Sequence, residues 1–256
     1  MTNHKLLGII TITLIIISHN IFIFAENSYK LPDGSIYIGA MMNGLFNGKG
    51  VLEWSNGNKY EGEFKNGLME GNGKYTGRIS SYEGTYKNGI PDGYGEIKYS
   101  NGDRYFGNFK DGYYHGKGTF IYHDGSTYVG NFEYGIKKGK GNLNYKNGNG
   151  YTGQFDNGLF NGKGSFSYAN GDYYVGFFKD GLFEGEGSYT YKKSGKVSRG
   201  TFKAGNFVGD KNGNSFYFDD LHLILAIIGI ISIALNIFLA IKICGRKVKA
   251  QDTETK

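Results

Sequence analysis

Residues 105–127 read YFGNFKDGYYHGKGTFIYHDGST, and this stretch decides the fold. Tyr105, Gly107 and Phe109 recur at every second position, and so do Gly116, Gly118, Phe120 and Tyr122. Residues spaced by two lie on one face of an extended chain, which predicts two β-strands, each with an aromatic and glycine face. The residues between them, such as Asn108 and Lys117, are mainly polar and face the other way.

The same pattern recurs along the chain as about seven and a half copies of a 23-residue unit. The copies begin at Tyr37, Tyr60, Tyr82, Tyr105, Tyr128, Tyr151 and Tyr174, with a half copy from Ser198, and successive starts are 22 to 24 residues apart. Asn-Gly and Asp-Gly pairs between the strands suit tight connections that need a positive φ. Each unit is therefore predicted to be a β-hairpin, and stacked hairpins can cover faces that one hairpin leaves exposed.

The tyrosine that begins each copy and the glycine two residues later are the expected structural positions of the repeat. A glycine would leave room for a Tyr or Phe ring from a neighbouring strand to lie flat over the backbone. With two strands per unit, the array would be elongated, roughly 70 to 80 Å if straight. The structural positions are Tyr37, Gly39, Tyr60, Gly62, Tyr82, Gly84, Tyr105, Gly107, Tyr128, Gly130, Tyr151, Gly153, Tyr174 and Gly176.

The Tyr-x-Gly-x-Phe and Gly-x-Gly-x-Phe-x-Tyr elements resemble those of the MORN (membrane occupation and recognition nexus) repeat family. The resemblance covers residues 37–209, and residues 26–36 hold a linker and a partial unit. It implies an all-β fold, a single-sheet meander of stacked hairpins that serves protein assembly, membrane apposition and, in some members, phospholipid contact. Irregularities are expected at Met41, at residues 76–80 and at residues 193–195, where the pattern is broken.

Both ends of the chain are predicted to be membrane segments. Residues 1–25 carry an apolar run that suits either a signal peptide cleaved after Ala25 or an uncleaved signal anchor. After a linker, 210–220, residues 221–243 are long and apolar enough for a transmembrane helix, and the basic residues 244–256 predict a cytoplasmic tail. Both signals place the array outside the cytosol in a single-pass membrane protein.

Two features of the C-terminal segment favour further interactions. Gly229 and Asn236 share one side of the expected helix with small residues, a pattern that allows helices to associate. Cys244 lies at the expected cytoplasmic edge, where it is either acylated or a plain free thiol.

The formal charge is +6, but nucleic acid is not the expected partner, because the excess lies mainly at the ends of the chain and forms no basic stripe. Four lysines at the centre of Gly-x-Gly, Lys49, Lys117, Lys140 and Lys163, are candidate contacts for anionic phospholipid or a protein partner. The alternative is a solvated face neutralised by nearby carboxylates.

No catalytic constellation, cofactor motif or metal-ligand pattern stands out, so the chain is not expected to be an enzyme. The sequence favours a scaffold that presents a repeat surface, with a phospholipid-binding tether and a glycan-binding aromatic face as alternatives.

Overall fold

The computed structural model describes residues 27–210, and every element in this range is a β-strand. The predicted segments 1–25, 221–243 and 244–256, with Gly229, Asn236 and Cys244, lie outside the described residues. Within residues 27–210 no helix could cross a membrane.

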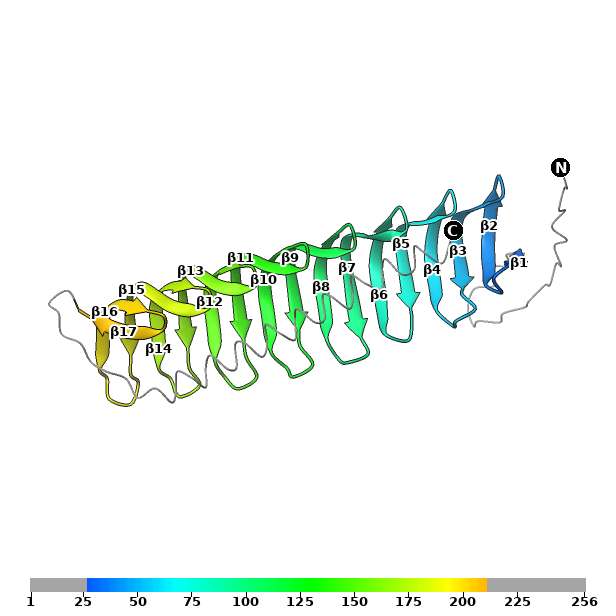
Figure 1. Ribbon diagram of the computed structural model, residues 1–256. Helices are drawn as coiled ribbons and strands as arrows, with labels where there is room; N and C mark the ends of the chain where they lie inside the picture. The colour runs from blue at the N-terminus through cyan, green and yellow to red at the C-terminus, as the bar shows by residue number, and fades with distance from the viewer. Residues whose placement is uncertain (1–26, 211–256) are drawn as a thin grey trace, which may run out of the picture. The chain divides into compact units, whose positions relative to one another are not determined.

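The chain divides into two units between Tyr113 and Tyr114, within β9 (Tyr113–Ile121). In each unit, successive strands pair antiparallel, so the predicted all-β meander of stacked hairpins is confirmed (Figure 1). The first unit contains β1 (Ser28–Lys30), β2 (Ile36–Met42), β3 (Leu45–Glu53), β4 (Lys59–Lys65), β5 (Leu68–Thr76), β6 (Ser80–Lys87), β7 (Ile90–Tyr99) and β8 (Arg104–Lys110). The second contains most of β9, then β10 (Thr127–Glu133), β11 (Ile136–Asn144), β12 (Gly150–Asp156), β13 (Leu159–Ser167), β14 (Tyr173–Lys179), β15 (Leu182–Thr190), β16 (Val197–Lys203) and β17 (Asn206–Gly209).

Within each unit, the register aligns equivalent residues of the repeats in rows across the strands. Gly153 of β12 pairs with Gly141 on one side and with Gly164 on the other, and glycines meet in the same way throughout both units. Next to this row, Tyr151 pairs with Leu143 and Phe166. The sheet therefore has one row without side chains beside a row of large apolar ones.

The tyrosine rings fill the glycine row and form the core. A Cβ on Gly153 or Gly164 would lie 2.4 or 2.6 Å from the Tyr151 hydroxyl. The ring therefore covers a glycine of its own strand as well as one of the neighbouring strand, whereas we expected only a neighbour's ring. The reason is that the side chain leans along its own strand. The seven repeat tyrosines are at most 3% exposed.

A hydrogen bond explains why this position is tyrosine rather than phenylalanine. The hydroxyl of Tyr151 donates to the carbonyl oxygen of Gln154 at 2.8 Å, and Tyr37, Tyr60, Tyr82, Tyr105, Tyr128 and Tyr174 make the equivalent bond to the carbonyl three residues on. That carbonyl belongs to a bulge, where the pairing of β12 with β13 shifts between Gly153 and Phe155. The ring thus packs over the glycines, and the hydroxyl bonds a carbonyl oxygen that the hydrogen bonds between β12 and β13 leave unpaired at the bulge.

Edge-to-face ring contacts join one repeat to the next. Tyr151 meets Phe155 of its own strand and Phe178 of the following repeat, at centroid distances of 5.1 and 4.9 Å with interplanar angles of 89° and 83°. In the first unit, Tyr60 meets Phe64 and Tyr86 in the same way. A single hairpin cannot bury its aromatic face. The ring contacts between repeats supply this packing.

The predicted irregularities fall where the pattern is broken, and the strand register absorbs them. The loop between β5 and β6 is shortened, with Gly77 donating to the carbonyl of Ser80, yet Tyr75 still pairs with Tyr82. The loop after Tyr191 is lengthened, and Tyr189 still pairs with Ser198. Met41 occupies the ring position of β2 and pairs with Phe46.

Candidate interaction surface

The four candidate lysines lie at one register position on the face opposite the tyrosines, here called the outer face. Lys49 (β3), Lys117 (β9), Lys140 (β11) and Lys163 (β13) are all exposed. Asn72, Tyr94 and Glu186 occupy the same position in β5, β7 and β15. The lysines are therefore equivalent in the repeat, and their neighbours distinguish them.

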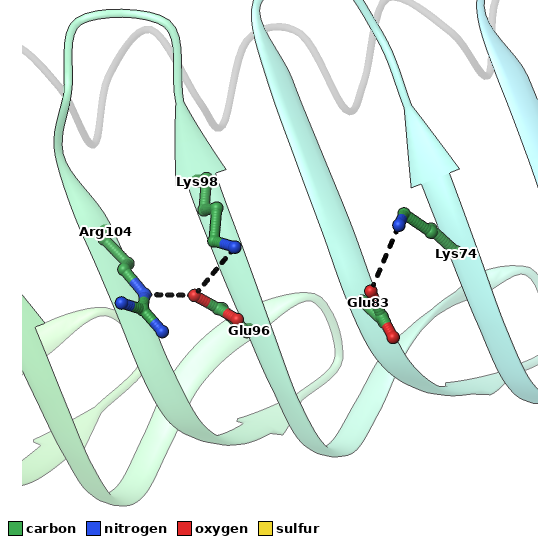
Figure 2. A network of polar contacts seen from close by, with 5 residues as sticks. All are labelled: Lys74, Glu83, Glu96, Lys98 and Arg104. Carbon is green, nitrogen blue, oxygen red and sulfur yellow. Dashed lines mark hydrogen bonds and ion pairs between the residues drawn. The ribbon is translucent and has the colours of Figure 1, made fainter.

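In the first unit, carboxylates lie opposite the cations. Lys49 pairs across the strands with Glu63. Figure 2 shows the same arrangement further along this face: the ammonium of Lys74 is 3.4 Å from a carboxylate oxygen of Glu83. Glu96 contacts both Lys98, at 3.5 Å, and Arg104 (Figure 2). The outer face of this unit therefore places carboxylates beside its cations.

In the second unit, uncharged residues lie opposite the lysines. Lys117 pairs with Asn131, Lys140 with Gln154 and Lys163 with Phe177. The Lys163 ammonium lies 5.4 Å from the centre of the Phe177 ring, a cation–π distance. Here the repeat position carries positive charge without a carboxylate in the paired position.

An exposed apolar strip accompanies these lysines. Tyr173, Val175 and Phe177 alternate along β14 on the outer face, with 44%, 50% and 42% of their surface exposed. Ser165 and Ser188 flank Val175 on the two neighbouring strands. The sequence alone did not lead us to this strip. Its signal was that Val175 and Phe177, which alternate with the pattern residues of the repeat from Tyr174, are both apolar.

Most rings of the opposite, aromatic face are engaged in packing. Phe160 and Phe183 stack on Tyr151 and Tyr174 at 3.8 Å, and Phe46 stacks on Tyr37 at 4.0 Å. Tyr168 and Tyr191 at the margin of this face are half-buried and contact Phe166 and Tyr189. The aromatic face therefore serves mainly as the core.

Lys137 is an exception on the aromatic face that the sequence analysis missed. It occupies the position at which Phe46, Phe160 and Phe183 stack in other repeats, and it is only 4% exposed. Its ammonium donates to the Tyr122 hydroxyl at 3.1 Å and lies 5.3 Å from the centre of the Tyr128 ring. Burial lowers the pKa of Lys137 to about 8. Aligning the second residue of the second strand of each hairpin would have shown that this repeat has Lys where others have Phe.

The remaining titratable groups suggest no reactive centre in the described residues. Burial is the main cause that raises the pKa of Tyr60 to about 12, and it also raises the pKa of Tyr128 and Tyr151, so these phenols stay protonated at neutral pH. Between residues 27 and 210 no group of three His, Cys, Asp or Glu side chains could hold a metal ion.

Comparison with known proteins identifies the repeat. The family model of the MORN repeat matches residues 37–59, 60–80, 82–104, 105–127, 128–150, 151–173 and 174–196, more than half of the chain. No curated protein sequence matches this chain significantly.

Two solved structures that match the chain share little sequence with it. The TCP domain of Drosophila melanogaster SAS-4 (dCPAP), in complex with a proline-rich motif of Ana2 (dSTIL), is 13% identical over 75% of this chain and 100% of that one, with a TM-score of 0.29. The TCP10 domain of Danio rerio CPAP, in complex with a STIL peptide, is 14% identical over 69% and 99%, with a TM-score of 0.21. Likeness at this level carries no conclusion about binding.

Proposed function

Because the chain belongs to the MORN repeat family, we propose that it is a non-enzymatic scaffold whose repeat surface docks partner proteins. The observation that supports this role is that the aromatic face is uniform between repeats, whereas the outer face varies. On the aromatic face, the repeat tyrosines make the same hydrogen bond in every full copy. On the outer face, equivalent positions hold Lys, Asn, Tyr or Glu. One face builds the sheet, and the other is free to differ in what it contacts.

We further propose that the scaffold is displayed from a membrane. This rests on the sequence of residues 1–25 and 221–243 and on the basic tail that follows. In this arrangement the array lies outside the cytosol, and residues 244–256 lie inside.

Proximity labelling of the full-length protein tests the docking role. A labelling enzyme fused after residue 26 should mark a reproducible set of proteins, and the set should shrink when the outer face is altered. A second fusion after Lys256 should mark only cytosolic proteins. Labelling that does not depend on the outer face would contradict the scaffold role, and cytosolic labelling from the first fusion would contradict the topology.

A further inference from the structure

We propose that the outer face of the second unit, from Lys117 of β9 to Phe177 of β14, binds an acidic amphipathic helix of a partner protein laid across the strands. The inference rests on the proposed docking function and adds the face, the partner's chemistry and its orientation.

Charge is the first step of the argument. Lys140 and Lys163 are exposed and lie opposite Gln154 and Phe177, whereas Lys49 at the same repeat position lies opposite Glu63. A cation row without carboxylates in the paired positions attracts an acidic surface, while the ion pairs of the first unit satisfy one another. The outer face from β9 to β14, which ends before Glu186 of β15, is therefore the part that complements an acidic partner.

Apolar surface is the second step. The row beside the lysines is uncharged from β9 to β15: it runs through Thr119, Val129, Asn142, Thr152, Ser165, Val175 and Ser188. Val129 and Val175 are both 50% exposed, and Phe177 is 42% exposed. The corresponding row of the first unit includes Glu61, Lys74, Glu83 and Glu96. Apolar side chains of a partner can be buried against the second unit without leaving charges unpaired.

The pitch of the lysines selects a helix. They stand on every second strand, and strands lie about 4.8 Å apart, so neighbouring lysines repeat at about 10 Å. A helix brings residues seven apart to the same face at a rise of about 10.5 Å. An extended chain covers this distance in about three residues, which puts the next side chain on the opposite face. Carboxylates at every seventh position of a helix therefore match the lysine row, and about two heptads reach from Lys117 to Lys163.

Two synthetic helical peptides of about 20 residues provide the probe. The first carries Glu at every seventh position, with Leu at the third and fourth positions after each Glu. The second has the same composition, with its Glu residues distributed around the helix. Fluorescence anisotropy measures their binding to the full-length protein in neutral detergent. We expect the first peptide to bind more tightly, with an affinity that falls as salt rises.

Matched substitutions locate the site. The double variant Lys140→Gln and Lys163→Gln should raise the Kd of the first peptide about tenfold. Lys49→Gln is the control, because it removes a lysine of the same repeat position from the neutralised unit, and the Kd should stay unchanged. Equal losses in both variants, equal binding of the two peptides, or an unchanged Kd in the double variant would each overturn the proposal.

Further readouts separate this proposal from its alternatives. Vesicles with anionic lipid that compete with the peptide and bind more tightly would assign the face to a membrane instead. In proximity labelling, the double variant should lose partners that Lys49→Gln retains. If it retains them all while other outer-face changes remove them, the helix site is wrong and the docking role stands. If no outer-face change matters, the docking role itself fails.

Discussion

Gly153 shows how strictly the tyrosine ring limits its neighbours. We expect Gly153→Ala to lower the free energy of unfolding by about 2–4 kcal/mol, because a Cβ would lie 2.4 Å from the Tyr151 hydroxyl and 2.7 Å from the Cα of Gly164, so the ring and the paired strand must both move. Urea denaturation followed by near-UV circular dichroism measures the loss. Gly150→Ala on the same strand is the control, since its Cβ would meet side-chain oxygens at 3.1 and 3.3 Å that can shift. Similar losses in both variants would remove the ring as the cause.

Lys137 places an amine where other repeats stack a ring. We expect Lys137→Phe to raise the free energy of unfolding by about 1–3 kcal/mol at pH 7. The substitution removes a buried charge, and the new ring can stack on Tyr128 as Phe160 stacks on Tyr151. Denaturant titration of both proteins measures the gain. A less stable variant would show that the lysine's contacts with Tyr122 and Tyr128 outweigh the burial of its charge.

The pH dependence at this residue has a defined sign. The pKa of Lys137 is about 8 in the folded chain and 10.5 in its ordinary state. Between these values the unfolded chain holds the extra proton, so the residue's destabilising effect is full below pH 8 and is relieved as the pH rises. The stability difference between Lys137→Phe and the natural protein should therefore shrink from pH 7 to pH 9.5. A constant difference would show that the amine is not titrating in that range.

Ala204 is a weak point of an otherwise regular turn element. Both residues of each two-residue turn have positive φ, and this first position is Asn or Asp in most repeats but Ala204 (φ 49°) in the last. We expect Ala204→Asn to stabilise the protein by about 0.5–1 kcal/mol, because Asn tolerates the left-handed region better than Ala. Ala204→Val should destabilise it, since a β-branched residue is least suited to this region. Thermal melts of the three proteins give the order, and Val melting above Asn would contradict it.

The hairpins themselves could be predicted because their evidence is local. Alternation at every second residue and the Asn-Gly pairs identify strands and turns without tertiary information. The lean of Tyr151 over its own strand could not be predicted so easily, since it depends on the bulge after Gly153. That bulge leaves a carbonyl for the hydroxyl to bond.

The outer face could be predicted only in part. The repeat pattern placed Lys140 and Lys163 on the polar face. Whether a carboxylate lies opposite a lysine depends on its cross-strand neighbour, which is Glu63 for Lys49 and Gln154 for Lys140. That pairing follows from the register, which hydrophobic periodicity alone does not fix between repeats. Lys137 was hidden for a different reason: its position had no assigned role until the stacking of Phe160 was seen.

At the scale of the whole molecule, repeated tyrosines give a shared response to alkaline pH. Burial raises the pKa of Tyr60 to about 12, and it also raises the pKa of the equivalent Tyr82, Tyr128 and Tyr151. Their stabilising contribution is complete below the ordinary pKa of 10.0 and is lost as the pH rises toward 12. We expect near-UV circular dichroism and tyrosine ionisation at 295 nm to change together in this range. Ionisation of all tyrosines near pH 10 without loss of structure would show that the buried rings are accessible in the folded chain.

Because each repeat contacts mainly its neighbours, whole repeats should be removable. Deleting residues 151–173, one matched unit of 23 residues, joins Gly150 to Tyr174 and lets Leu143 pair with Tyr174 as it now pairs with Tyr151. Phe178 would then contact Tyr128 in place of Phe155. We expect a folded protein that is less stable by about 1–3 kcal/mol, at the usual 0.05–0.15 kcal/mol per residue. Deleting only residues 151–161 is the control: it brings β13 to the position of a tyrosine strand and leaves its glycine row uncovered. Limited proteolysis and denaturation should show an ordered second unit after deletion of residues 151–173 and a disrupted one after deletion of residues 151–161. Disruption by both deletions would mean that stability does not depend on neighbouring repeats alone.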